Sequence, residues 1–405
     1  MAAAVAAALN ATVSSPSGDD DDDTQTDSDI AATAAAEAAA LEASADGGSS
    51  AAQPVFVAPS SAAELCIFAG NGNPLLARDV CSALGVQLGR ANVSAFADGE
   101  INVRFIDSVR GRDCYVIQSL CGPNTQDQIM ELLLMISCLR RSSAERIVAV
   151  IPYFAYARQL DPITYGRTHI PAADLARMME AAGVDHVVAV DLHRPQVTGF
   201  FEHTPVDNLD TQGSVLPYLL NSKHFNRRPV TVVAPVGGTV RRALKFRNAL
   251  NRAGVEAGMA FSYMTSEHGK VVSSSEKAHH AQLDISAEHV EIVGDIKGRD
   301  IIIVDDMVDS ASRICAVSYA LKAGGAKSVY AYATHGLLSG NAVEMIEASP
   351  LKEVVVFDTV PVPMSKQVGA VRQLSSSALI AETIRRLHNN QSTSHLAHAY
   401  AEYSE

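Results

Sequence analysis

Short, unbroken aliphatic runs alternate along this chain with longer segments of helical periodicity. The run at 301–304 is the clearest, and it stops at two adjacent aspartates. Strands of this kind are buried on both faces, which occurs when helices cover both sides of a parallel sheet. Strands are predicted at 65–69, 114–118, 146–151, 186–191, 230–234, 257–263, 300–304, 328–334 and 353–357. Helices are predicted at 74–84, 126–141, 172–182, 238–253, 311–323, 340–348 and 376–388.

The order of these elements predicts an α/β protein built from two similar halves. The chain has 405 residues, which is room for two domains, and we place them at 61–207 and 208–390, with a polar tail at 391–405. Residues 1–60 are rich in Ala, Ser and Asp, carry ten acidic side chains and no Lys or Arg, and are expected to be disordered. Without them the net charge of -13 becomes -3, so the body is nearly neutral.

Several classes of partner and location are disfavoured by the sequence. No apolar stretch approaches the roughly 20 residues that cross a bilayer, and the start of the chain has an acidic run at 19–23 where targeting signals have basic residues. The six cysteines form no CxxC pair, which is typical of reduced thiols in a cytosolic protein. We therefore expect a cytoplasmic protein that binds neither membrane nor nucleic acid.

The end of the 301–304 run has the residues of a sugar phosphate site. Asp305 and Asp306 suit ribose hydroxyls or a Mg²⁺ ion, and a predicted helix begins near Asp309 and Ser310. The free N–H groups of a helix N-terminus bind phosphate. We therefore predict that this strand ends in a site for a ribose 5-phosphate group. The alternative is an ordinary strand-to-helix turn capped by Asp309 or Ser310.

Two other strand ends carry polar residues. His193 follows the strand at 186–191 and could ligate a metal or contact phosphate, although a single histidine there is more often structural. Gly237 and Gly238 follow the strand at 230–234 and would let a ligand approach the backbone, although a tight turn is the alternative.

Two further segments contain candidate binding groups. Asp98 and Glu100 lie in the stretch 96–102, which by itself indicates a solvated hairpin. Arg158 follows the aromatic residues of 153–156 and could clamp a nucleotide phosphate with two hydrogen bonds, or pack in an interface.

Taken together, these segments resemble the ribose-phosphate pyrophosphokinases, or PRPP synthetases. The likeness covers about residues 64–390 and rests on FADGEINVRF, AVIPYFAYARQ, DLHRPQVTGFF, VDDMVD and THGLLSG. Members have two phosphoribosyltransferase-like (Rossmann-like) domains, with mostly parallel sheets covered by helices. They transfer the diphosphate of Mg-ATP to the C1 hydroxyl of ribose 5-phosphate, giving PRPP and AMP for nucleotide biosynthesis. They form homo-oligomers, often hexamers.

The resemblance implies roles for individual residues. Groups that contact ATP would be Phe96, Asp98, Glu100, Arg158, Gln159 and His193. His193 would also act near the metal and the triphosphate, and the catalytic groups would be His193, Arg158 and Lys270. Asp305 and Asp306 would hold ribose hydroxyls, and the 5-phosphate loop would be Asp309, Ser310, Ala311, Ser312 and Arg313.

Three departures from the family pattern lie at the chemistry. The aspartate that usually precedes the double glycine is missing: the chain reads Ala234-Pro235-Val236-Gly237-Gly238, which is either one residue shorter than the family pattern or has the aspartate replaced. The stretch 261–270 lacks the family's Lys and Arg pair, although Lys270 or Lys277 could reach the site. The 5-phosphate loop lacks its usual glycine and has gained Arg313. Two hypotheses follow: an active synthetase, which we favour, or a catalytically silent relative that regulates active subunits in a hetero-oligomer.

Overall fold

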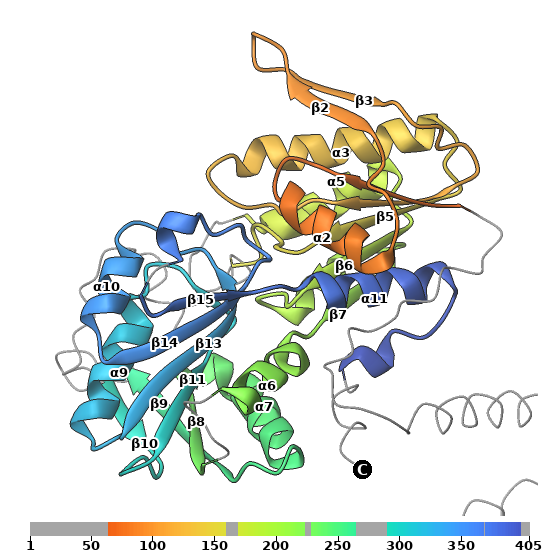
Figure 1. Ribbon diagram of the computed structural model, residues 1–405. Helices are drawn as coiled ribbons and strands as arrows, with labels where there is room; N and C mark the ends of the chain where they lie inside the picture. The colour runs from red at the N-terminus through yellow and green to blue at the C-terminus, as the bar shows by residue number, and fades with distance from the viewer. Residues whose placement is uncertain (1–63, 159–168, 223–227, 265–289, 368, 398–405) are drawn as a thin grey trace, which may run out of the picture. The chain divides into compact units, whose positions relative to one another are not determined.

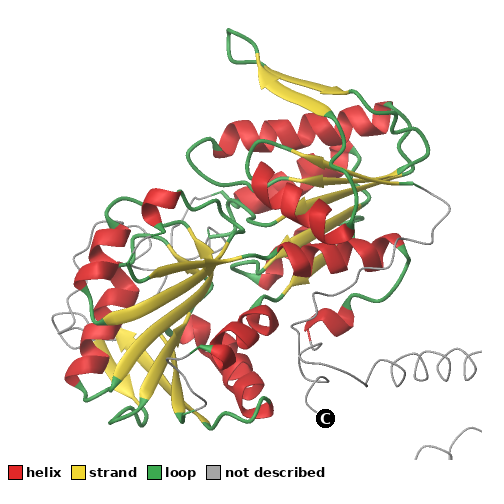
Figure 2. Cartoon of the chain, viewed as in Figure 1, coloured by secondary structure: helices red, strands yellow, loops and turns green. Residues whose placement is uncertain are grey.

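The described residues form two large sheets and a separate two-stranded hairpin, and most of the predicted elements are present (Figure 1). The computed structural model describes residues 64–158, 169–222, 228–264, 290–367 and 369–397. The fold class is the predicted one, an α/β fold with mostly parallel sheets covered by helices (Figure 2). Within this described part, no helix is both long and apolar enough to cross a bilayer.

The first sheet has five parallel strands in the order β1-β4-β5-β6-β7. Its strands are β1 (Leu65–Ala69), β4 (Asp113–Ile117), β5 (Arg146–Ile151), β6 (His186–Val190) and β7 (Val206–Leu209). The helices α3 (Thr125–Arg141) and α5 (Pro171–Ala182) bury their apolar side chains against one face. The helices α2 (Pro74–Leu84) and α11 (Ser377–His388) do so against the other.

The second sheet runs in the order β10-β9-β8-β11-β13-β14-β15, and only β10 is antiparallel to its neighbour. Its strands are β8 (Val230–Ala234), β9 (Ala257–Met264), β10 (Val290–Val293), β11 (Asp300–Val304), β13 (Ser328–Gly336), β14 (Leu351–Phe357) and β15 (Val371–Leu374); the short β12 (Met307–Val308) pairs with β13. One face is covered by α6 (Gln212–Asn221) and α7 (Val240–Arg252), the other by α9 (Ser312–Ala323) and α10 (Ala342–Ala348).

Some elements escaped prediction because they are not buried on both faces. The strands β2 (Ala91–Ala95) and β3 (Ile101–Phe105) form an antiparallel hairpin outside both sheets, and most of its side chains are partly or fully exposed. The edge strands β10 and β15 mix apolar with polar residues, since each is paired on one side only.

The last helix of the second half packs on the first sheet. The helix α11 lies beside α2 (Figure 1). The ring of His388 lies 2.7 Å from Asp113 Oδ2 at the start of β4. Arg146 donates to the same Asp113 carboxylate and to the carbonyl of Leu387, at 3.0 Å for the latter. The division at 207 and 208 remains a prediction, but these contacts tie the C-terminal helix to the first half.

The topology of the second sheet locates a ligand site. The neighbours of β8 are β9 on one side and β11 on the other, so the order of connection reverses between β8 and β11. Ligands of open parallel sheets bind beyond the carboxyl ends of the strands at such a reversal. The loops that follow β8 and β11 are the double-glycine turn and the two-aspartate segment.

Candidate functional site

A hydrogen-bonded pair joins the ends of two strands from different sheets. His193 follows β6, and its Nδ1 lies 2.6 Å from Oδ2 of Asp306, which follows β11. The residues are 113 positions apart in the sequence. Two of the three strand ends that the sequence singled out therefore meet at one place.

The two aspartates after β11 have opposite electrostatic environments although both are buried. Burial and the neighbouring charge of Asp306 raise the pKa of Asp305. Burial would also raise the pKa of Asp306, but the hydrogen bond and charge of His193 outweigh it and bring that pKa well below the ordinary carboxyl value. At neutral pH, Asp306 is thus the ionised member of the pair.

Asp191, at the end of β6, lies at the centre of a second network. Its carboxylate accepts hydrogen bonds from the Arg242 guanidinium of α7 and the Thr334 hydroxyl of β13. Its backbone carbonyl lies 3.1 Å from Nε2 of His335. Burial raises the pKa of Asp191 against the opposing charge of Arg242, and burial lowers the pKa of His335. The carboxylate of Asp191 is therefore compensated by a cation of the protein itself.

Arg158 connects the loop after β5 to the loop after β11. It donates from Nη1 to Oδ2 of Asp309 at 2.7 Å and from Nη2 to the hydroxyl of Tyr153 at 3.3 Å. Its side chain and that of Asp309 are each about two-fifths exposed, at 37% and 39%. A guanidinium in this place can hold phosphate oxygens in addition to its present partners.

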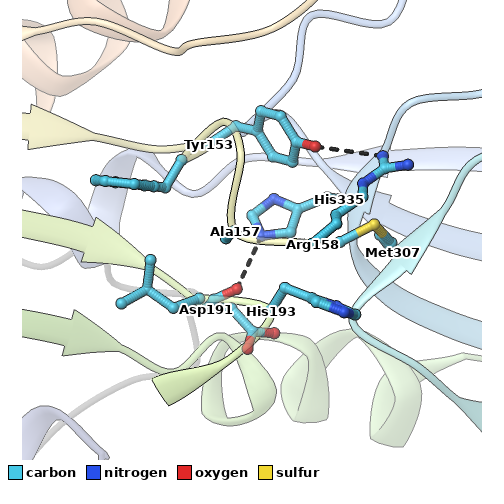
Figure 3. Close-up of a pocket in the computed structure, with 9 residues that line it drawn as sticks. Tyr153, Ala157, Arg158, Asp191, His193, Met307 and His335 are labelled. Atoms are coloured by element: carbon cyan, nitrogen blue, oxygen red, sulfur yellow. Dashed lines mark hydrogen bonds between the residues drawn. The ribbon is translucent and has the colours of Figure 1, made fainter. Parts of the chain in front are cut away.

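Four of these groups, Arg158, Asp191, His193 and His335, line one small pocket, shown in Figure 3. The close-up shows the Tyr153 hydroxyl facing Arg158 and the His335 ring facing Asp191. The ring of His335 also packs edge-on against Tyr153, with 5.1 Å between ring centroids. The pocket is lined by Tyr153, Phe154, Ala157, Arg158, Asp191, Leu192, His193, Met307 and His335.

The predicted 5-phosphate loop leads into α9 and includes its first two residues, since the helix begins at Ser312. Ala311 has a left-handed backbone with φ of 62°, a conformation that costs an L-residue on the order of 1–2 kcal/mol. The loop therefore turns into the helix without the family's glycine. The hydroxyls of Ser310 and Ser312 lie 3.0 Å apart, and Arg313 Nη1 lies 3.6 Å from Oδ2 of Asp305.

The double-glycine turn leaves space rather than supplying an unusual backbone. Gly237 and Gly238 are exposed, neither has a positive φ, and a Cβ atom on either would meet nothing within 4 Å. Val236, directly before the double glycine, is extended and partly buried. Further along the chain, the charged side chain of Arg242 contacts the site, because it donates a hydrogen bond to Asp191.

Not all predicted site residues gather here. Phe96, Asp98 and Glu100 lie at the turn between β2 and β3, all exposed, and none lines the pocket. There the carboxylate of Asp98 accepts a hydrogen bond from the Glu100 backbone at 3.1 Å, as the solvated-hairpin alternative predicts. Gln159 and Lys270 lie outside the described residues, so their predicted roles have no structural counterpart here.

Comparison with known proteins decides the family. Residues 65–183 match the profile of the N-terminal domain of ribose phosphate pyrophosphokinase, and residues 261–398 match that of the phosphoribosyl synthetase-associated domain. The ribose-phosphate pyrophosphokinase of Neisseria meningitidis serogroup A is 41% identical over 334 residues, which cover 82% of this chain and 94% of that protein. The chain belongs to the ribose-phosphate pyrophosphokinase family. The likeness predicted from the sequence motifs is thereby confirmed.

Two further proteins of the ribose-phosphate pyrophosphokinase family support the same assignment. The Burkholderia pseudomallei protein of that name is 42% identical over 330 residues, covering 81% of this chain and 96% of its own length. The crystal structure of phosphoribosylpyrophosphate synthetase from Mycobacterium smegmatis superposes with a TM-score of 0.71 at 36% identity, covering 81% of this chain and 99% of that one. The two-sheet fold is thus that of a pyrophosphokinase of this family.

The residues present fit a magnesium ion that arrives with its nucleotide. Among the described residues, no group of three or more His, Cys, Asp or Glu side chains is arranged to hold a metal. Mg²⁺ prefers oxygen ligands and often takes only one or two carboxylates together with substrate phosphates. Asp306 is the ionised carboxylate nearest to His193, and the Nδ1 atom of His193 is already engaged by it.

Several residues of the site were missed as candidates. Asp191, Arg242 and His335 were not assigned roles, although each follows or ends an aliphatic strand or glycine turn. His335 lies in the motif THGLLSG, at the end of β13. A rule that treats every polar residue at the end of a buried strand as a candidate would have included Asp191 and His335.

Proposed function

We propose that this protein transfers the β,γ-diphosphate of Mg-ATP to the C1 hydroxyl of ribose 5-phosphate, releasing PRPP and AMP. The observation that carries the proposal is the hydrogen bond between His193 and Asp306. It brings together a residue predicted to contact the triphosphate and a residue predicted to bind the ribose. Family membership supplies the reaction class.

For ribose 5-phosphate, we infer that the sugar hydroxyls bind at Asp305 and Asp306 and the phosphate at 309–313. The ionised Asp306 is a hydrogen-bond acceptor for a hydroxyl. The first N–H groups of α9 have no partner within the helix, and they attract an anion. Arg313 is within reach of this end of β11 through Asp305 and would add a positive charge to the phosphate site.

For ATP, we infer that Arg158 and His193 hold the polyphosphate. Diphosphoryl transfer needs in-line positioning of the sugar hydroxyl and donors for the growing negative charge. Arg158 can supply a fork of N–H donors, and the Nε2 atom of His193 is left for the substrate because Nδ1 is held by Asp306. Bound Mg²⁺ would neutralise charge on the transferred group.

The remaining proposals rest on the family and on composition. We place Phe96, Asp98 and Glu100 against the nucleotide, and Gln159 beside its phosphates, as the resemblance implies. Lys270 is our candidate to replace the family's Lys and Arg pair. We also infer a cytoplasmic homo-oligomer. In support of a reducing compartment, all six cysteines are free.

The test is a direct assay of AMP and PRPP formation. Purified full-length protein is mixed with Mg-ATP and ribose 5-phosphate, with inorganic phosphate present, and AMP is separated by chromatography. AMP that forms only when ribose 5-phosphate is present supports the proposal, and the Asp306→Asn variant should reduce it strongly. No AMP above background at high protein concentration would overturn it.

A second candidate is a catalytically silent subunit that regulates active relatives. The contacts that favour it are those of Arg242 with Asp191 and of Arg313 with Asp305, because in both a cation of the chain already lies against a carboxylate of the site. A stable mixed oligomer on co-expression with an active synthetase, together with a negative AMP assay, would support this candidate.

A further inference from the structure

Two cysteines lie side by side at the opposite end of the first sheet from the candidate site. Cys66 of β1 and Cys114 of β4 are direct neighbours in the register of these parallel strands. Residues opposite each other in adjacent strands point to the same face, and both side chains belong to the same buried cluster. Neither residue has a role in the proposed transfer reaction.

A cation lies against this thiol pair. Nη1 of Arg112 is 3.4 Å from Sγ of Cys66, and the Cys114 thiol lies 3.8 Å from the Arg112 carbonyl. Nη2 of Arg112 also pairs with Glu64 at 2.9 Å, and the Arg112 side chain is 29% exposed. The pair is therefore buried but lies directly beneath a partly exposed guanidinium near the start of both strands.

The electrostatic environment separates Cys66 from the other thiols. The hydrogen bond with the Cys114 thiol lowers the pKa of Cys66, burial opposes this, and Arg112 lowers it further. The pKa of Cys114 is raised, first by its hydrogen bond with Cys66 and then by burial. By contrast, burial raises the pKa of Cys81, Cys121 and Cys315 to about 11. Thiolate is the reactive form of cysteine, so Cys66 is the nucleophile of the pair.

We propose that Cys66 and Cys114 form a peroxide-oxidisable pair in which Cys66 reacts first and Cys114 closes a disulfide between β1 and β4. The Cys66 thiolate attacks one oxygen of the peroxide, the O–O bond breaks, and after protonation the products are a sulfenic acid and water. The Cys114 sulfur then attacks the sulfenic sulfur and a second water leaves. In sum, two thiols and one hydrogen peroxide give one disulfide and two waters.

The burial of the pair selects the oxidant. Cys66 is 8% exposed and Cys114 is fully buried, so a small peroxide can reach them more readily than a bulky disulfide such as oxidised glutathione. Disulfides of reducing compartments are usually transient or redox-sensing, which fits a pair that forms and is reduced again. This inference does not depend on the proposed transfer activity.

The experiment uses the reduced, full-length protein. It is treated with hydrogen peroxide, or in a second arm with oxidised glutathione, and the remaining thiols are alkylated before proteolysis and mass spectrometry without reductant. The expected result is a Cys66–Cys114 cross-linked peptide pair, two hydrogens lighter than the reduced peptides, that appears with peroxide and disappears with dithiothreitol. Cys81→Ser is the matched control and should form the same cross-link at the same rate.

Two variants test the order of events. In Cys114→Ser, Cys66 should be oxidised to sulfinic acid without a cross-link. Arg112→Gln keeps both thiols, and in an assay at a pH below the lowered pKa of Cys66 it should slow the cross-link about tenfold if it raises that pKa by roughly one unit. Thermal melts verify that each variant is folded. The proposal is overturned if Cys138 or another cysteine is consumed before Cys66, if no cross-link forms, or if oxidised glutathione reacts as fast as peroxide.

Discussion

His193 Nδ1 lies 2.6 Å from Asp306 Oδ2, which joins the carboxyl ends of β6 and β11. Asp306 is 4% exposed, and an unpaired carboxylate at that depth would be unfavourable. The imidazole lowers the pKa of Asp306 and so keeps the carboxylate ionised. In return, Asp306 fixes the orientation of the His193 ring. Because Nδ1 is hydrogen-bonded to Asp306, Nε2 points away from that carboxylate. One hydrogen bond thus keeps Asp306 as an ionised acceptor and leaves the Nε2 atom of His193 outside that contact.

Replacing Asp306 by asparagine should weaken the binding of ribose 5-phosphate more than the binding of ATP. The substitution removes the charge that accepts a hydroxyl hydrogen bond, and such charged hydrogen bonds contribute about 1.5–3 kcal/mol. We expect the dissociation constant for ribose 5-phosphate to rise roughly 10- to 100-fold. Calorimetric titration of each ligand measures the two effects separately.

Asp300→Asn is the matched control for this prediction. Asp300 is also buried but begins β11 instead of following it, and it pairs with Lys327 at 3.6 Å. Its replacement should leave ribose 5-phosphate affinity unchanged. Equal losses of both ligands in Asp306→Asn would contradict the assignment of this strand end to ribose.

The stability of the protein should fall as pH rises because of Asp305. Its pKa is raised by burial and by the charge of Asp306, so the folded state keeps a proton that the unfolded state releases above about pH 4. The unfolding free energy therefore decreases from that pH up to the raised pKa. Asp306, with its lowered pKa, is ionised in both states above about pH 5 and adds no slope there.

Asp305→Asn isolates this contribution. Asparagine has no proton to release in this pH range. The unfolding free energy of the variant, relative to that of the unmodified protein, should therefore increase from about pH 5 to about pH 8. Urea unfolding followed by far-ultraviolet circular dichroism at several pH values measures the difference. Parallel curves for the two proteins across this range would show that Asp305 titrates normally.

Arg158→Lys should impair transfer although the charge is kept. Arginine holds Asp309 and Tyr153 at once through two nitrogens, and lysine cannot reproduce this planar fork. Loss of one transition-state donor costs on the order of 10²–10³ in kcat, and a retained charge should leave a loss of about tenfold or more. The assay is AMP formation at saturating substrates.

Arg177→Lys is the control for the arginine substitution. Arg177 pairs with Asp174 on the surface of α5, and its side chain is 67% exposed. An exposed pair of this kind contributes little, so transfer should be unaffected. If Arg158→Lys is as active as Arg177→Lys, Arg158 does not act on the phosphates.

The sequence predicted the interior of the fold better than its edges. The strands β5, β8 and β11 have the predicted bounds because strands buried on both faces are mainly aliphatic. The hairpin strands β2 and β3 have no buried residue, and the edge strand β15 is buried only in part. Without a continuous apolar run, the sequence of such a segment contains no clear strand signal.

The site was predictable in its parts but not in its pairings. The aspartates after β11 and the histidine after β6 were recognisable from their positions at strand ends. That His193 would face Asp306, or that Arg158 would reach Asp309, depends on how two sheets come together. The contact of Arg242 with Asp191 was equally hidden, because a turn of helix and a strand end separated by 51 positions meet only in the folded chain.

The core beneath the first sheet should depend on a helix from the end of the chain. Ile384 of α11 is fully buried in the cluster that includes the apolar face of α2. Replacing a buried isoleucine by alanine removes apolar contact and leaves a cavity, which costs about 2–5 kcal/mol.

Leu75→Ala provides the comparison, because Leu75 is on the adjacent helix α2 but is 64% exposed. It should change the unfolding free energy by no more than about 0.5 kcal/mol. Urea unfolding followed by circular dichroism suits this protein, which has no tryptophan. If Ile384→Ala unfolds in two steps and the first half unfolds first, α11 belongs to the first half in folding as well as in packing. A stability equal to that of Leu75→Ala would mean that α11 contributes no essential part of that core.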